Sequence, residues 1–214
     1  MNKLELNVQE SWNQGLERWS HPSIPRVITP KSEEEFIQLK ELGQILKEQL
    51  AFMNIKNFQT YMNLENIIKE CPKNSQRASN AISKHEIGHR FCPYDIVTAI
   101  ILDHNAKKEL EKVPYGKEKA SKLITNLFED MCINTKLTKS GDEDISWLYQ
   151  ELSKGKENNS LWNVYAKSME LVWHKEILPT DRKLNEEELN AANEIANLFE
   201  NDYLSISENY QYFD

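Results

Sequence analysis

The sequence predicts an α+β fold that is predominantly α-helical. Most of the chain carries apolar residues at every third or fourth position, which is typical of amphipathic helices, whereas one stretch has a mixed periodicity that can hold extended strands. Turn-forming residues separate these stretches. With 214 residues, of which 39% are hydrophobic, the chain is long enough to bury one sizeable core beside a second lobe. We therefore expect an arm, a core and a C-terminal lobe.

The first region, residues 1–31, is expected to be an irregular arm packed through its tryptophans, because prolines interrupt any periodic pattern. The core is expected to span residues 32–139. It would begin with an amphipathic helix from Ser32 to about Asn54, which would support the rest of the core. Residues 58–71 follow with mixed periodicity, and a small β-hairpin is one alternative for them.

The last region, residues 140–214, is expected to be a helical C-terminal lobe. It opens with a turn at residues 140–142, and helical patterns follow at residues 143–154, 160–176 and 185–204. The acidic run Glu186–Glu188 comes directly after Asn185, a residue that can cap a helix. We therefore interpret these carboxylates as solvated positions of a first helical turn, where the helix dipole favours negative charge.

The charge balance excludes nucleic acid as an expected partner. The chain has 34 acidic and 26 basic side chains, a formal net charge of −8, and no block of lysine or arginine that could follow a phosphate backbone. It also lacks an apolar run long enough for a signal peptide or a membrane span. With only three cysteines in unpaired spacing, it is expected to be cytoplasmic. The oligomeric state is left open.

The most informative motif is His85-Glu86-Ile87-Gly88-His89, within a helix expected from Ser75 to Phe91. Residues four apart share one face of a helix, so His85 and His89 can each present a nitrogen to one zinc ion. Glu86 projects at the edge of that face, from where it can take a proton from a metal-bound water. Gly88 leaves room for a substrate or a crossing backbone.

The other side of this helix is charged. Arg77, Lys84 and Arg90 mark it, whereas the histidines continue a stripe of small apolar residues. Histidines placed by chance on a solvated helix would more often lie on the charged side. The pattern therefore favours histidines that face the interior and bind a metal over a histidine pair without one.

A catalytic zinc ion usually has three protein ligands and a water molecule. The best candidate for the third ligand is Glu129, in a second helix expected over residues 121–133. Asn126 and Asp130 lie beside it on the polar margin of that helix. One of these side chains can serve as an acceptor that orients a ligand histidine, so we predict Asn126 and Asp130 as supporting residues.

Together, the HExxH motif and a helical Asn126-x-x-Glu129-Asp130 about forty residues later resemble the gluzincin type of zinc metallopeptidase. The resemblance covers roughly positions 75 to 135. It implies a zincin-like catalytic core with a small β-sheet, zinc bound by His85, His89 and Glu129, Glu86 as general base and acid, and Asp130 in support of a histidine. Strand addition of the substrate at a sheet edge is also implied.

Two rival third ligands are weaker. Asp95 follows His89 by six residues, as the third ligand of metzincins does, but Cys92 and Pro93 replace the glycine turn of that family. Asp95 also suits the N-cap of a following helix. Cys92 lies seven residues after His85, on the same helical face, but Pro93 would end the helix there.

The function expected from these residues is hydrolysis of peptide bonds by zinc-activated water, with a peptide or protein as substrate. Two alternatives stay open: a zinc-binding protein without turnover, and a helical interaction protein in which the motif is fortuitous. The residue that would stabilise the oxyanion is not identified by the sequence, and neither is the cleavage specificity.

Overall fold

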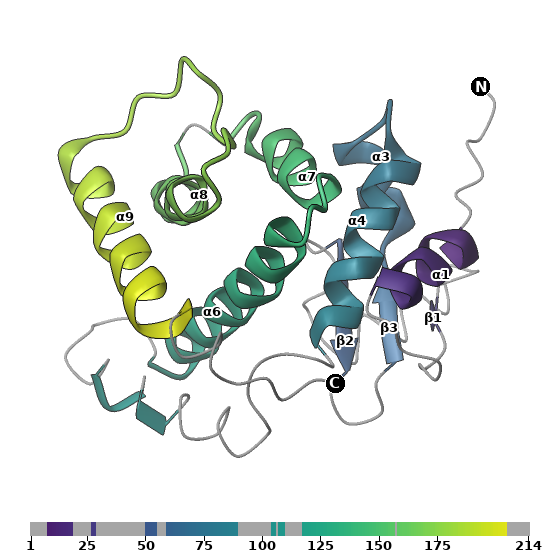
Figure 1. Cartoon of the computed structure of the whole chain (residues 1–214), viewed down its shortest axis with the longest axis horizontal. Coiled ribbons are helices and arrows are strands. Elements are labelled where there is room, and N and C mark those ends of the chain that lie inside the picture. Colours follow the sequence, from purple (N-terminus) through teal and green to yellow (C-terminus); the bar gives the residue numbers. More distant parts are fainter. Residues whose placement is uncertain are drawn as a thin grey trace. The chain divides into compact units, whose positions relative to one another are not determined.

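The structure is a computed structural model, and it describes residues 8–18, 27–28, 50–54, 59–89, 104–105, 107–109, 117–156 and 158–204. Contacts within the chain define two compact units (Figure 1). Unit 1 consists of Met1–Phe91 and Glu143–Glu151, and unit 2 of Cys92–Asp142 and Leu152–Asp214. The region boundaries predicted after residues 31 and 139 stay predictions.

Unit 1 is built around α4 (Ser75–Gly88). The helices α1 (Val8–Arg18) and α3 (Leu64–Glu70) both pack against α4, and the strand β2 (Ala51–Asn54) contacts it too (Figure 1). Ten of the fourteen residues of α4 are buried, which marks it as the central helix of this unit. The sequence indicated this helix correctly but did not indicate α1, which lies in the arm expected to be irregular.

The contact between α1 and α4 depends on small side chains. A Cβ atom added at Gly15 would lie 2.5 Å from Cδ1 of Ile87 and 3.3 Å from the backbone of Ser83, so only glycine fits there without a shift of its neighbours. Beside it, the buried Ser11 hydroxyl donates to Asn80 Oδ1 at 2.7 Å and accepts from Gln76 Nε2 at 2.8 Å. These contacts seat α1 closely on α4.

Three short strands complete unit 1: β1 (Val27–Ile28), β2 and β3 (Gln59–Met62), in the order β1-β3-β2. β1 runs parallel to β3, and β2 pairs with β3 in antiparallel register, with Phe52 opposite Tyr61. The strands are only two, four and four residues long, so the sheet is small beside the helices of this unit. β2 lies where the sequence predicted the end of a helix that reaches about Asn54. That prediction is wrong for the residues of β2.

The predicted α+β class with a zincin-like core is therefore wrong, because the three short strands are a minor part of the fold. Helices make up most of the described residues, and the fold is mostly helical. The physical reason lies in residues 58–71: their mixed periodicity did not separate helix from strand, and most of this stretch resolves into the short β3 followed by α3.

Unit 2 is centred on α8 (Ser160–Trp173), which packs against both α6 (Lys117–Lys139) and α9 (Glu186–Leu198). Figure 1 shows α8 almost end-on, with the other two helices on either side. The indole nitrogen of Trp173 donates a buried hydrogen bond of 2.8 Å to the hydroxyl of Thr135 and so connects α8 to α6. The π-helical segment η4 (Phe199–Leu204) continues α9.

The ends of the C-terminal helices agree with the sequence patterns to within a few residues. α7 (Asp144–Ser153) follows the predicted turn, and α8 begins where Asn159 accepts a hydrogen bond from the backbone of Trp162. α9 begins with a capping box between Asn185 and Glu188. Among the residues that the structure describes, no helix combines the length and the apolar character needed to cross a bilayer.

Candidate metal centre

The two histidines of the motif lie together at the C-terminal end of α4. Their Nε2 atoms are 3.2 Å apart, and the two rings are almost perpendicular, with an interplanar angle of 88°. Both side chains are partly exposed. His85 belongs to the last turn of the helix, and His89 is its C-cap with helical backbone angles. The spacing of four residues therefore places both imidazoles on one face, as expected from the sequence.

This separation fits two ligands of one zinc ion. Zinc–nitrogen bonds of 2.0–2.1 Å at the tetrahedral angle place the two nitrogens about 3.3 Å apart. The observed Nε2–Nε2 distance of 3.2 Å matches that value, so the two nitrogens would not have to move closer together or farther apart to bind one ion. The same distance also suits a hydrogen bond in which one imidazole donates to the other. The geometry thus accommodates zinc as well as a metal-free histidine pair.

Glu86 follows His85 directly and is buried, with 4% of its surface exposed. On a helix of 3.6 residues per turn it points about 100° away from His85, toward the edge of the histidine face. Gly88 and Ile87 beside it are buried too. The carboxylate is therefore shielded from bulk water, which strengthens its electrostatic interactions with any charge at the histidines.

The flank of α4 that the sequence marked as charged is not fully solvated. Asp144, in the first turn of α7, accepts from Lys84 Nζ and from Arg77 Nε, both at 2.8 Å. The Arg77 guanidinium also lies 4.5 Å from the centre of the Trp147 ring. Lys84 is consequently buried. No local pattern revealed this contact, because Asp144 lies sixty residues away in the sequence.

The two cations also set the state of the Asp144 carboxyl group. Burial alone would raise its pKa, but the hydrogen bonds and charges of Lys84 and Arg77 outweigh burial and hold the pKa below its usual range. Asp144 is therefore a carboxylate at neutral pH, in ion pairs with both neighbours.

The predicted supporting residues Asn126 and Asp130 contact each other on α6. The Asn126 amide donates to Asp130 Oδ2 at 3.1 Å, one helical turn apart, and Glu129 lies beside them with a partly exposed side chain. All three belong to unit 2, whereas both histidines belong to unit 1. The assignment of Glu129 as third ligand therefore stays a prediction. The rival ligands Cys92 and Asp95 lie outside the described residues.

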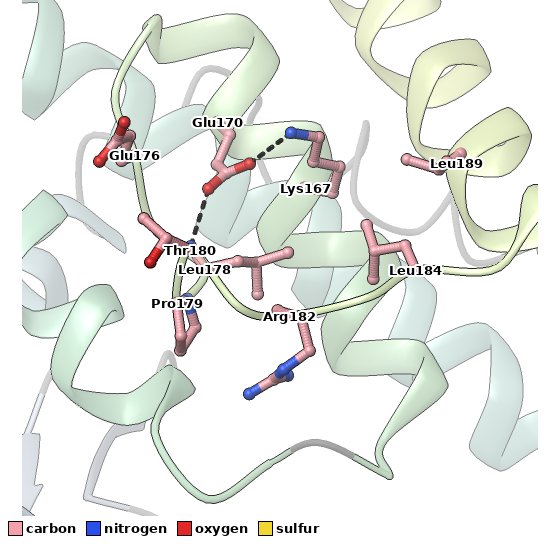
Figure 2. Close-up of a pocket in the computed structure, with 9 residues that line it drawn as sticks. All are labelled: Lys167, Glu170, Glu176, Leu178, Pro179, Thr180, Arg182, Leu184 and Leu189. Atoms are coloured by element: carbon pink, nitrogen blue, oxygen red, sulfur yellow. Dashed lines mark hydrogen bonds and ion pairs between the residues drawn. The ribbon is translucent and has the colours of Figure 1, made fainter.

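Unit 2 contains a separate hollow of about 380 Å³ between α8, α9 and the segment that joins them. Figure 2 shows the residues that line it: Lys167, Glu170, Glu176, Leu178, Pro179, Thr180, Arg182, Leu184 and Leu189. Glu170 accepts from Lys167 and from the backbone of Ile177 and Leu178, which engages both of its oxygens. Its charge therefore stabilises the loop that joins α8 to α9.

No protein-family model matches the chain, and no curated protein and no solved structure shows a significant match to it. The gluzincin resemblance rests on the two short motifs around His85 and Glu129.

Proposed function

We propose that this protein binds zinc through His85 and His89 and hydrolyses peptide bonds in a peptide or protein substrate. The observation that carries the proposal is the separation of 3.2 Å between the two Nε2 atoms, which equals that of two nitrogens on a tetrahedral ion within a few tenths of an ångström. Bound zinc would lower the pKa of its water to about 7. A cytoplasmic location remains part of this proposal and rests on the sequence.

In this proposal Glu86 is the general base. It takes one proton from the attacking water while the hydroxide oxygen bonds to the carbonyl carbon of the substrate. As the C–N bond breaks, Glu86 returns that proton to the amine that leaves. Once a substrate reaches it, the shielded carboxylate would interact more strongly with charge that develops during the reaction than an exposed one would.

The third ligand is proposed to be Glu129. The Asn126 amide already engages Asp130 on the same helix, which favours Asp130 as a supporting residue. If Glu129 is the ligand, Glu129→Gln should weaken zinc binding more than Asp130→Asn does. The reverse order would assign the ligand to Asp130, and unchanged affinity in both variants would leave Asp95 and Cys92 as the candidates.

Metal content is the first test. Protein dialysed against zinc and then freed of excess metal should contain one equivalent, measured by elemental analysis. His85→Ala and His89→Ala should each abolish stoichiometric zinc, because either substitution leaves α4 with a single zinc ligand. His104→Ala is the matched control, since His104 is exposed and lies outside the motif. Unaltered protein without zinc would contradict the proposal.

Activity is the second test. Glu86→Gln should reduce peptide hydrolysis by about 100-fold to 10,000-fold while zinc stays bound, because it removes the proton acceptor and keeps the shape of the side chain. Glu70→Gln is the control, since Glu70 is exposed at the end of α3. Loss of zinc together with activity would show that Glu86 has another role.

One observation favours the alternative of a zinc site without turnover. Glu86 has only 4% of its surface exposed, so a substrate must displace what covers it before contact. A structural site would bind zinc and show no hydrolysis in either the unaltered protein or Glu86→Gln. A metal-free histidine pair in a helical interaction protein would show neither zinc nor hydrolysis.

A further inference from the structure

The hollow of unit 2 has the size and the lining of a small-molecule site. Its volume of about 380 Å³ falls near the lower end of the range for ligand pockets, roughly 300 to 1,000 Å³. Lys167 supplies an ammonium group, and four side chains supply apolar surface: Leu178, Pro179, Leu184 and Leu189 (Figure 2). The whole lining belongs to unit 2, so the hollow is defined within one unit.

The carboxylate and the ammonium in the hollow use their hydrogen-bonding capacity to different degrees. Glu170 accepts three hydrogen bonds, one from Lys167 Nζ at 2.6 Å and two from the backbone N–H groups of Ile177 and Leu178, both at 2.8 Å. The Lys167 ammonium has three N–H donors, and among the described residues Glu170 is its one partner. The carboxylate is therefore nearly saturated, whereas two donors of the ammonium are left for a ligand.

The exposed fractions agree with this difference. Only 12% of the Glu170 side chain is exposed, against 30% of the Lys167 side chain. Leu189, on α9, leaves 37% of its surface exposed beside the hollow. An apolar group that covers this leucine removes hydrocarbon surface from water, which favours binding. A ligand with an acceptor for Lys167 and an apolar part for Leu189 therefore complements the hollow.

We propose that this hollow binds a small aliphatic carboxylate, with its charged group on Lys167 and its hydrocarbon part against Leu178, Leu184 and Leu189. A charge-assisted hydrogen bond is about twice as strong as one between neutral groups, so a carboxylate is favoured over an alcohol of the same chain. An amine would instead place a second cation beside the Lys167 ammonium. This site is separate from the proposed zinc site and does not depend on it.

The other charges of the lining permit an anion. Arg182 and Glu176 add one charge of each sign, but Glu176 is exposed to water, which screens its charge more strongly than that of the half-buried Arg182. The backbone N–H groups of Ile177 and Leu178 stabilise the charge of Glu170, which limits its repulsion of a second carboxylate on Lys167. The hydrogen bonding of the Lys167–Glu170 pair therefore decides the preference.

The first test is a ligand series on the unaltered, full-length protein. Octanoate, added below its micelle concentration, should shift the amide signals of the segment that joins α8 to α9 in nuclear magnetic resonance spectra. Octanol and protonated octylamine should bind roughly tenfold more weakly. N-acetyl-leucine distinguishes the source of the carboxylate. Tighter binding of octanoate would indicate a fatty acid, tighter binding of N-acetyl-leucine would indicate an acid derived from an amino acid, and both results support the proposal.

The second test uses variants of the lining. Lys167→Met should weaken octanoate binding about tenfold and leave octanol binding unchanged, whereas Lys167→Arg keeps the charge and should keep most of the affinity. Lys183→Met, at an exposed lysine outside the lining, is the control. Leu189→Ser should weaken octanoate and octanol alike, by about threefold. Its control is Leu198→Ser, since Leu198 is exposed on the same helix and does not line the hollow.

Three results would overturn the inference. Octanol or octylamine could bind as tightly as octanoate, octanoate could leave the amide signals of this segment unchanged, or Lys167→Met could bind octanoate as the unaltered protein does. The ligand series needs no substitution, so it decides the question even if Lys167→Met does not fold. None of these results bears on the zinc site, which is tested through His85, His89 and Glu86.

Discussion

The motif helix of unit 1 and the α8–α9 connection of unit 2 are held in different ways. α1 seats on α4 through a glycine and neutral side chains, with Gly15 against Ser83 and Ile87. In unit 2, charged side chains bind backbone groups: Arg182 donates to two backbone carbonyls, and Glu170 accepts from two backbone N–H groups. The α1–α4 contact thus depends on shape, and the loops of unit 2 depend on charge.

This difference teaches which perturbation each region resists. A contact made by close packing tolerates changes of pH but not added volume. A loop held by charge-assisted hydrogen bonds tolerates changes of volume at its surface but not the loss of a charge. On the side that faces α1, the helix that carries His85 and His89 is held by close packing.

The largest expected effect is at Gly15. Gly15→Val should lower the free energy of unfolding by about 3 kcal/mol, because its Cβ would overlap Ile87 and crowd the backbone of Ser83. Urea unfolding followed by circular dichroism measures the change. Glu17→Val, at an exposed position of α1, is the control for a valine outside the close contact; helix propensity does not explain a loss at Gly15, because valine is a better helix former than glycine. Equal effects of both substitutions would show that the close contact is unimportant.

The next largest loss of stability is expected when Arg182 is replaced. Its guanidinium donates to Asn163 Oδ1 at 2.6 Å and to the carbonyls of Ser153 and Lys156 at 2.8 and 3.2 Å. Arg182→Met should cost about 2 kcal/mol, because it removes charge-assisted hydrogen bonds to a buried amide and to the end of α7. Lys183→Met, at the exposed neighbour, should change stability little in the same measurement. A similar loss in both variants would contradict the assignment.

A smaller, pH-dependent effect is expected at Glu188. The backbone N–H of Asn185 and the side chains of Asn163 and Ser160 donate to its carboxylate and lower its pKa, burial opposes this weakly, and the charge of Arg182 adds to it. The stabilisation by this carboxylate is therefore fully present above about pH 4.5, the pKa of the group in the unfolded chain, and it is lost as the pH falls through the lower pKa of the group in the folded protein.

Glu188→Gln should thus cost about 1 kcal/mol at pH 7 and progressively less in acid, because the capping box loses its charge. Thermal unfolding across pH 2.5 to 7, in steps of about half a unit, measures this dependence. Glu187→Gln, exposed in the same helical turn, is the control. A difference between Glu188→Gln and the unaltered protein that stays constant with pH would refute the role of the charge.

The smallest expected effect is a gain in stability at His174. His174 ends α8 in the left-handed conformation, with φ 52° and ψ 40°, which strains a residue that has a Cβ. His174→Gly should stabilise the protein by about 0.5 kcal/mol, since glycine adopts this cap without that strain. His174→Ala keeps the Cβ and should give no gain in the same unfolding measurement. A gain with alanine as well would point to the imidazole itself.

The sequence predicted those elements whose signals are local. The motif helix, the helix around Glu129 and the C-terminal helices follow from apolar spacing and from caps such as Asn159 and Asn185. It missed α1 because a glycine and scattered prolines argue against a helix, although Gly15 is where α4 needs space. It extended a helix into β2 because short strands carry almost no periodic signal.

By itself, the sequence determined that His85 and His89 share one face of a helix, because backbone hydrogen bonds four residues apart make that face a property of spacing alone. Only the tertiary structure decided that Lys84, beside them, would be buried against Asp144. The partner lies sixty residues away, and no local pattern encodes which charges meet when the chain folds. The histidine pair is therefore readable from the sequence, and its electrostatic surroundings are not.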